Sequence, residues 1–159
     1  MVSVRPLRRH NFKALTKLSM DLFSRHNEAG FPITDASISA MLNSFLANSQ
    51  GYFRGLFDDE ELVGWMYCMN GHSNHHSAVT GMSQVYYHSS LTGMKAVRGL
   101  LLIHEDFFKF AEKRGIEIAV TSSSLPNSDV FVRILQKGGW TPVGNGRLTR
   151  ATKHHRGTR

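Results

Sequence analysis

The sequence predicts a single domain of mixed α/β class, and three observations support this prediction. The chain has 159 residues, which is enough for one hydrophobic core. Its composition, 41% hydrophobic and 19% charged, is typical of a globular protein. Segments with helical periodicity are interspersed with short apolar or alternating runs, and neither an internal repeat nor a linker interrupts them.

The first third of the chain predicts one strand and two helices. Residues 2–6 alternate in polarity and stop at Pro6, as a short strand does. Residues 11–30 carry apolar side chains at helical spacing and end at Gly30. A second amphipathic helix is expected over residues 34–50, with Thr34 and Asp35 as N-cap candidates. Four apolar side chains share one face of this helix: Ile38, Met41, Leu42 and Leu46.

The middle of the chain predicts a β-hairpin followed by a loop and a strand. Residues 52–57 and 62–71 are apolar runs joined by "DDEE" (58–61), which we expect to be a solvated turn. Residues 71–81 are polar and contain His72, His75 and His76. No carboxylate or cysteine accompanies these histidines, so the pattern favours a loop over a metal site. A strand is expected over residues 82–88.

The last third predicts the order helix, strand, helix, strand, strand. The expected ranges are 95–114, 116–123, 128–139, 140–144 and 146–152, with Gly115 ending the first helix. The whole order is therefore β-α-α-β-β-β-α-β-α-β-β. We place one domain over residues 1–152 and a basic tail, expected to be mobile, over residues 153–159.

Charge and cysteine content limit the classes of function. The single cysteine, Cys68, excludes an intrachain disulfide and fits a reducing compartment. Neither a secretory h-region nor an apolar run of about 20 residues is present, so we expect a cytoplasmic protein without a membrane span. The net charge is +7, and no acid follows Asp129. The tail has no aromatic residue for base stacking, so any binding of nucleic acid is expected to be nonspecific.

The junction of strand and helix within residues 86–108 predicts an anion site. The stretch "YYHSSLTGMKAVRGLLLIHEDFF" passes through Gly93 into an apolar helix, with Lys95 and Arg98 at its start. A helix N-terminus binds anions such as phosphate through its free N–H groups and its dipole. The alternative is that both cations are only solvated. Cations in a first helical turn oppose the dipole, which favours an anionic partner.

Two motifs make the sequence resemble the GNAT family of acyl-CoA-dependent N-acetyltransferases. The first is the family's fourth strand, glycine turn and paired leucines, which this chain follows only in part. The second is "PNSDVFVRILQKGGWTPVG", similar to the family's closing Asn, helix and Gly-aromatic pair. Positions that align with the motifs are Tyr87, Ser89, Thr92, Gly93, Val97, Leu100, Leu101, Asn127 or Ser128, and Gly139-Trp140.

The resemblance implies a central, mostly antiparallel sheet with splayed fourth and fifth strands and helices on both faces. It implies acetyl-CoA as cosubstrate and an amine of a small molecule or protein as acceptor, and it leaves a homodimer open. The cofactor's pantetheine arm would lie along Tyr86, Tyr87 and His88. Its phosphates would lie at the following turn, and the closing motif would complete the site. The implied binding residues beyond the strand are Thr92, Gly93, Met94, Lys95, Ala96, Val97, Arg98, Gly99, Asn127 and Ser128.

The catalytic groups that the resemblance implies are partly missing. Leu135, or Ile134 in a shifted register, replaces the family's tyrosine acid, and Gln84 and Ser83 replace its glutamate base. The remaining acid or base candidates are His88, Tyr86, Tyr87 or an ordered water, with His88 the candidate base. The resemblance also implies that the backbone N–H near Tyr87 polarises the thioester carbonyl.

Two functions therefore remain open. The first is an N-acetyltransferase. The second is an inactive GNAT-fold protein that acts by contact, as a phage-type accessory or virion component or as an inhibitor of a host protein. His104, on the apolar face of the long helix, is expected to be a hydrogen-bonded core histidine and not a catalytic one.

Overall fold

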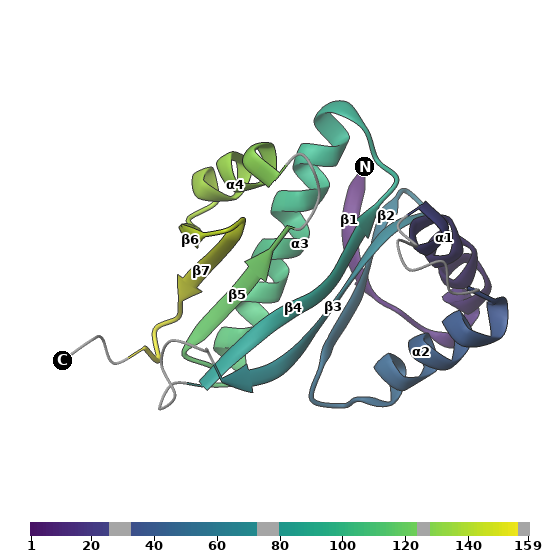
Figure 1. Ribbon diagram of the computed structural model, residues 1–159, viewed down its shortest axis with the longest axis horizontal. Helices are drawn as coiled ribbons and strands as arrows, with labels where there is room; N and C mark the ends of the chain where they lie inside the picture. Colours follow the sequence, from purple (N-terminus) through teal and green to yellow (C-terminus); the bar gives the residue numbers. More distant parts are fainter. Residues whose placement is uncertain (26–32, 73–79, 124–127, 156–159) are drawn as a thin grey trace.

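The computed structural model describes residues 1–25, 33–72, 80–123 and 128–155, which form a seven-stranded sheet covered by helices (Figure 1). The strands are β1 (Val2–Pro6), β2 (Tyr52–Asp58), β3 (Glu61–His72), β4 (Thr80–Ser89), β5 (Ile118–Ser122), β6 (Thr141–Gly144) and β7 (Arg147–Ala151). The helices are the 3-10 turn η1 (Arg9–Asn11), α1 (Phe12–Arg25), α2 (Asp35–Ala47), α3 (Gly93–Lys113) and α4 (Ser128–Lys137). The predicted element order is confirmed.

The sheet has the strand order β1-β2-β3-β4-β5-β7-β6. All neighbouring pairs are antiparallel except β4 and β5, which are parallel. The expectation of a mostly antiparallel sheet is therefore confirmed. The parallel pair is connected through α3, as a parallel connection needs a crossover.

Two hydrophobic clusters lie on opposite faces of the sheet. One contains apolar side chains of α1 and α2, and the other contains those of α3 and α4, so the helices cover both faces as expected. Successive side chains of β3 alternate between the two clusters. Trp65 and Tyr67 pack in the cluster with α1 and α2, and Met66 and Cys68 pack in the cluster with α3 and α4. Burial on both faces explains why β3 is a nearly continuous apolar run.

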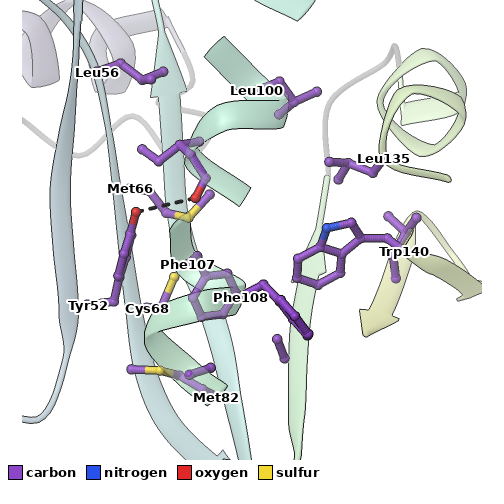
Figure 2. Packing of buried hydrophobic residues seen from close by; sticks show 14 of the residues in the cluster. Tyr52, Leu56, Met66, Cys68, Met82, Leu100, Phe107, Phe108, Leu135 and Trp140 are labelled. Atoms are coloured by element: carbon purple, nitrogen blue, oxygen red, sulfur yellow. Dashed lines mark hydrogen bonds between the residues drawn. The ribbon is translucent and has the colours of Figure 1, made fainter. Parts of the chain in front are cut away.

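Aromatic rings fill the centre of the α3 side. Figure 2 shows Tyr52 of β2 and Phe107 of α3 within this core, with Trp140 beyond them. The Tyr52 hydroxyl donates to Asp106 Oδ2 at 2.8 Å, and the rings of Phe107 and Trp140 stack at 6.1 Å. These contacts fix α3 against β2 and against the start of β6, and so fix the N-terminus of α3 above the sheet.

Candidate functional site

Strands β4 and β5 separate beyond their first residues. Their parallel pairing runs only from Gly81–Ile118 to Ser83–Val120, whereas β4 stays paired with β3 as far as Ser89. A bulge marks the point of separation, because Tyr67 pairs with Tyr86 but Cys68 pairs with Gln84, which leaves Val85 as the extra residue. The predicted splay of the fourth and fifth strands is thus confirmed, and among the described residues it leaves the β5-facing edge of residues 84–89 without a neighbouring strand; we call this edge the wedge.

The peptide groups of Tyr87 face this wedge. The Ser90 N–H donates to the Val63 carbonyl at 2.8 Å, which makes Val63 and Ser90 a hydrogen-bonded pair. Hydrogen-bonded and non-hydrogen-bonded pairs alternate along an antiparallel ladder, so the Met66–Tyr87 pair is non-hydrogen-bonded. The N–H and C=O of Tyr87 therefore point away from β3, toward the side that β5 has left.

Side chains at the end of β4 alternate between the two faces of the sheet. Tyr86 lies on the α1/α2 side, with its ring 5.5 Å from Phe23 and 6.0 Å from Trp65. His88 pairs across the strands with Trp65 and shares that face. Tyr87 lies on the α3 side, 5.7 Å from the ring of His104. The His88 side chain and the Tyr87 ring therefore lie on opposite faces of the sheet.

The Tyr87 phenol is not a base. Burial raises the pKa of Tyr87 above its usual range, and a hydrogen bond with Ser89 only partly offsets this. Its hydroxyl therefore stays protonated at neutral pH. The peptide N–H of Tyr87 faces the wedge, and its ring packs on the α3 side, so its phenol is a poor candidate for the base.

His104 is a buried residue of α3 that forms a hydrogen bond with β5. The Leu100 carbonyl, 2.9 Å from Nδ1, can only accept, so Nδ1 carries the proton. Nε2 then accepts from the Thr121 hydroxyl at 2.8 Å. Burial lowers the pKa of His104 to about 4, so the imidazole is neutral. The prediction of a core histidine is confirmed, and the bond to Thr121 explains how its second nitrogen is satisfied.

The turn between β4 and α3 leaves a helix N-terminus open. Thr92 occupies the N-cap without a side-chain cap bond. Gly93 has φ +61°, a conformation that glycine adopts without strain, and a Cβ there would meet open space. Helix α3 begins at Gly93, two residues before the predicted start at residue 95. Its first N–H groups, which lack intrahelical partners, are therefore available to an anion.

The two cations of this turn differ in their contacts. Arg98 is exposed, whereas Lys95 Nζ lies 2.6 Å from Asp58 Oδ2. Asp58 ends β2, and its carboxylate is also 3.5 Å from the amino group of Met1. The acidic turn 58–61 is thus more than the solvated turn that the sequence predicted, because it supplies a counterion to α3.

The remaining predicted residues are distributed unevenly. Asn127 lies outside the described residues, as do His75 and His76, and Ser128 is the first residue of α4. Leu135 is completely buried and Ile134 is half-buried in the α3-side core.

Among the described residues, no group of three His, Cys, Asp or Glu side chains is placed to hold a metal. Two surface depressions, of about 310 and 290 Å³, lie beside α4 and share Lys137, away from the Tyr87 wedge.

No helix in the described part of the chain is long and apolar enough to cross a membrane. The sequence matches no model of a protein family, and no protein with a curated description matches it significantly. Solved structures, in contrast, match over nearly the whole chain. An acetyltransferase of the GNAT family from Staphylococcus aureus Mu50 superposes with a TM-score of 0.68 at 10% identity, covering 96% of this chain and 100% of the other. The chain has the GNAT fold.

Two further structures with this fold were solved with ligands. PaiA N-acetyltransferase from Thermoplasma acidophilum, in complex with coenzyme A, superposes with a TM-score of 0.63 at 14% identity, covering 95% and 99% of the two chains. NAA60 from Arabidopsis thaliana, in complex with a bisubstrate analogue, gives 0.67 at 12% identity, covering 97% and 99%. At these identities the comparison shows that the chain shares the GNAT fold.

Most of the sequence-predicted residues lie in one stretch of the chain. Tyr86, Tyr87 and His88 lie near the end of β4, and residues 92–99, which begin three residues after the end of β4, form the N-cap and first turns of α3. Sequence reasoning missed Asp58 and Thr121. A polar residue inside the apolar run of β5 was the available signal for Thr121, whereas the sequence carries no signal that Asp58 meets Lys95.

Proposed function

We propose that the protein is an acetyl-CoA-dependent N-acetyltransferase that transfers the acetyl group to an amine of a small molecule or protein. The observation that carries this proposal is the wedge of β4, where the N–H and C=O of Tyr87 face away from β3 and meet no neighbouring strand among the described residues, close in sequence to the uncapped N-terminus of α3. The coenzyme A complex of a protein with this fold supports the choice of cofactor.

The described residues fit such a cofactor. An extended chain with amide groups can pair with the free edge of β4, because that edge offers the N–H and C=O of Tyr87. Phosphates fit the open amides near Gly93, where no Cβ intrudes, and Arg98 and Lys95 supply positive charge. Val97 is half-buried, so its branched side chain is directed partly into the protein.

The chemistry follows from the position of these groups. The neutral amine attacks the thioester carbonyl carbon, a C–N bond forms, the C–S bond breaks, and the thiolate takes up a proton while the amine loses one. The Tyr87 N–H would donate to the carbonyl oxygen as negative charge develops on it. His88, on the α1/α2 side, would accept the proton of the amine directly or through water.

The direct test is binding followed by turnover. Calorimetry should show binding of acetyl-CoA, and the release of free thiol should rise when a panel of primary amines is added. Changing His88 to Gln should lower kcat while the affinity for acetyl-CoA stays within about twofold. Absence of acetyl-CoA binding in the wild-type protein would refute the proposal.

A second function is favoured by one observation. By the resemblance, Leu135, or Ile134 in a shifted register, stands where the family has its tyrosine acid, and Gln84 and Ser83 stand where it has its glutamate base. Leu135 is fully buried. A protein with this site could bind acetyl-CoA without transferring its acetyl group. Binding without thiol release for any amine in the panel would support this second function.

A further inference from the structure

A lysine in the first turn of α3 is already paired with an anion. Asp58 Oδ2 lies 2.6 Å from Lys95 Nζ, and Lys95 is the third residue of α3. The Asp58 side chain is only 21% exposed, whereas that of Lys95 is 58% exposed. The carboxylate is therefore the fixed partner of this pair, and the lysine is the one that can turn toward another ligand.

The surroundings of Asp58 keep it ionised. Its pKa is lowered, first by the hydrogen bond from Lys95 and further by the amino group of Met1 at 3.5 Å. At neutral pH, Lys95, Arg98 and Asp58 together therefore carry a charge of +1, where the two cations alone would carry +2.

We propose that Asp58 competes internally for Lys95, so that Lys95 contributes to binding the phosphates of a cofactor at the α3 N-terminus only when its ammonium leaves the Asp58 carboxylate. This inference rests on the proposed function for the identity of the cofactor. Asp58 then lowers the affinity for phosphate-bearing ligands and has no effect on an acyl thioester that lacks phosphate. Asp58 is thus a specificity-determining residue that acts through Lys95.

The neighbouring turn residue offers a matched control. Asp59 has the same charge and lies one position away, but its carboxylate contacts the Met1 amino group at 2.6 Å and not Lys95. Changing Asp59 to Asn removes a charge from the same turn and keeps the Asp58–Lys95 pair. A general effect of net charge would appear equally in Asp58→Asn and Asp59→Asn, whereas competition for Lys95 would appear in Asp58→Asn alone.

The experiment measures dissociation constants for acetyl-CoA by calorimetry at low salt. Asp58→Asn should bind about fivefold more tightly than the wild type, as expected for the loss of one exposed ion pair and its repulsion. The difference should shrink at about 0.5 M salt, where exposed charges are screened. Asp59→Asn should change the affinity by less than about twofold. Acetyl-pantetheine, which has no phosphate, should have the same KM with wild-type and Asp58→Asn protein.

A double-mutant cycle isolates the contact. When Lys95 is changed to Gln, the added substitution Asp58→Asn should no longer tighten binding. Unchanged or weaker binding of acetyl-CoA by Asp58→Asn, or an equal gain in the Lys95→Gln background, would overturn the proposal.

Inorganic pyrophosphate separates this inference from the proposed function. If the wild type fails to bind acetyl-CoA but Asp58→Asn binds pyrophosphate more tightly than the wild type does, the competition stands and the proposed cofactor is wrong. If neither protein binds pyrophosphate or acetyl-CoA, both the competition and the proposed function are refuted.

Discussion

His104 makes the stability of the fold depend on pH between about 4 and 6.5. The folded protein requires the neutral imidazole, because Nδ1–H donates to the Leu100 carbonyl and the unprotonated Nε2 accepts from the Thr121 hydroxyl. Burial lowers its pKa from 6.5 to about 4, against the small opposing effect of the Leu100 carbonyl. Over this range the unfolded chain binds more protons than the folded one, so stability is full above pH 6.5 and is lost as the pH falls toward 4.

The size of the effect follows from the two pKa values. A pKa of about 4 in the fold against 6.5 in the unfolded chain corresponds to roughly 3 kcal/mol of unfolding free energy. Carboxylates also contribute to acid sensitivity, so the comparison is between variants. His104→Gln retains a donor and an acceptor but does not titrate. Its urea unfolding free energy should therefore fall less steeply than that of the wild type between pH 6.5 and 4.5.

An exposed histidine provides the control. His10→Gln should keep the wild-type pH dependence, because His10 is exposed at the start of η1. The reasoning is refuted if His104→Gln shows the same slope as the wild type. It is also refuted if the His104 ring protons, followed by NMR in the folded protein, titrate near 6.5.

Three further predictions concern packing and the chain terminus. A Cβ on Gly64 would lie 2.6 Å from the His88 carbonyl oxygen, so Gly64→Ala should cost about 2 kcal/mol or more in thermal unfolding, whereas Gly71→Ala on the same strand meets nothing and should be nearly neutral. Leu135→Tyr should destabilise the protein by about 1–3 kcal/mol by overpacking a fully buried site, more than Ile134→Tyr does, and should not raise acetyl transfer. Lys153 N–H donates to Glu112 Oε2 at 3.0 Å, and His154 Nε2 lies 2.9 Å from the Glu112 carbonyl oxygen. Deleting residues 153–159 should therefore lower the free energy of unfolding in urea by about 1–2 kcal/mol, and an unchanged value would show that these contacts contribute nothing.

Local signals in the sequence predicted most elements of the fold. Thr34 was an expected N-cap, and its side chain accepts from the Ser37 N–H in a capping box. The acidic turn between two apolar runs correctly predicted the β2–β3 hairpin. These features depend on residues a few positions apart, so periodicity and turn chemistry are sufficient to find them.

Contacts between distant residues could not be predicted in the same way. Asp58 and Lys95 are 37 positions apart, and only the packing of the β2–β3 turn beside α3 brings them together. Lys153 and His154, which the sequence assigned to a mobile tail, form hydrogen bonds with Glu112 because β7 ends beside the C-terminal part of α3. The predicted domain limit at residue 152 remains a prediction, although ordered contacts continue beyond it.

The site therefore depends more on the backbone than on side chains. Among the described residues near the wedge, the Tyr87 hydroxyl is buried and protonated, His104 is neutral and fully hydrogen-bonded, and Leu135 cannot donate a proton. What the wedge offers is the Tyr87 peptide and the first amides of α3, groups that any sequence presents if its strands separate and its helix starts there. Backbone groups of this kind place few demands on side chains, which is compatible with sharing the GNAT fold at 10–14% identity to solved structures. The positions that set this backbone geometry are the bulge at Val85 and the left-handed Gly93, while residues such as Asp58 set the charge around it.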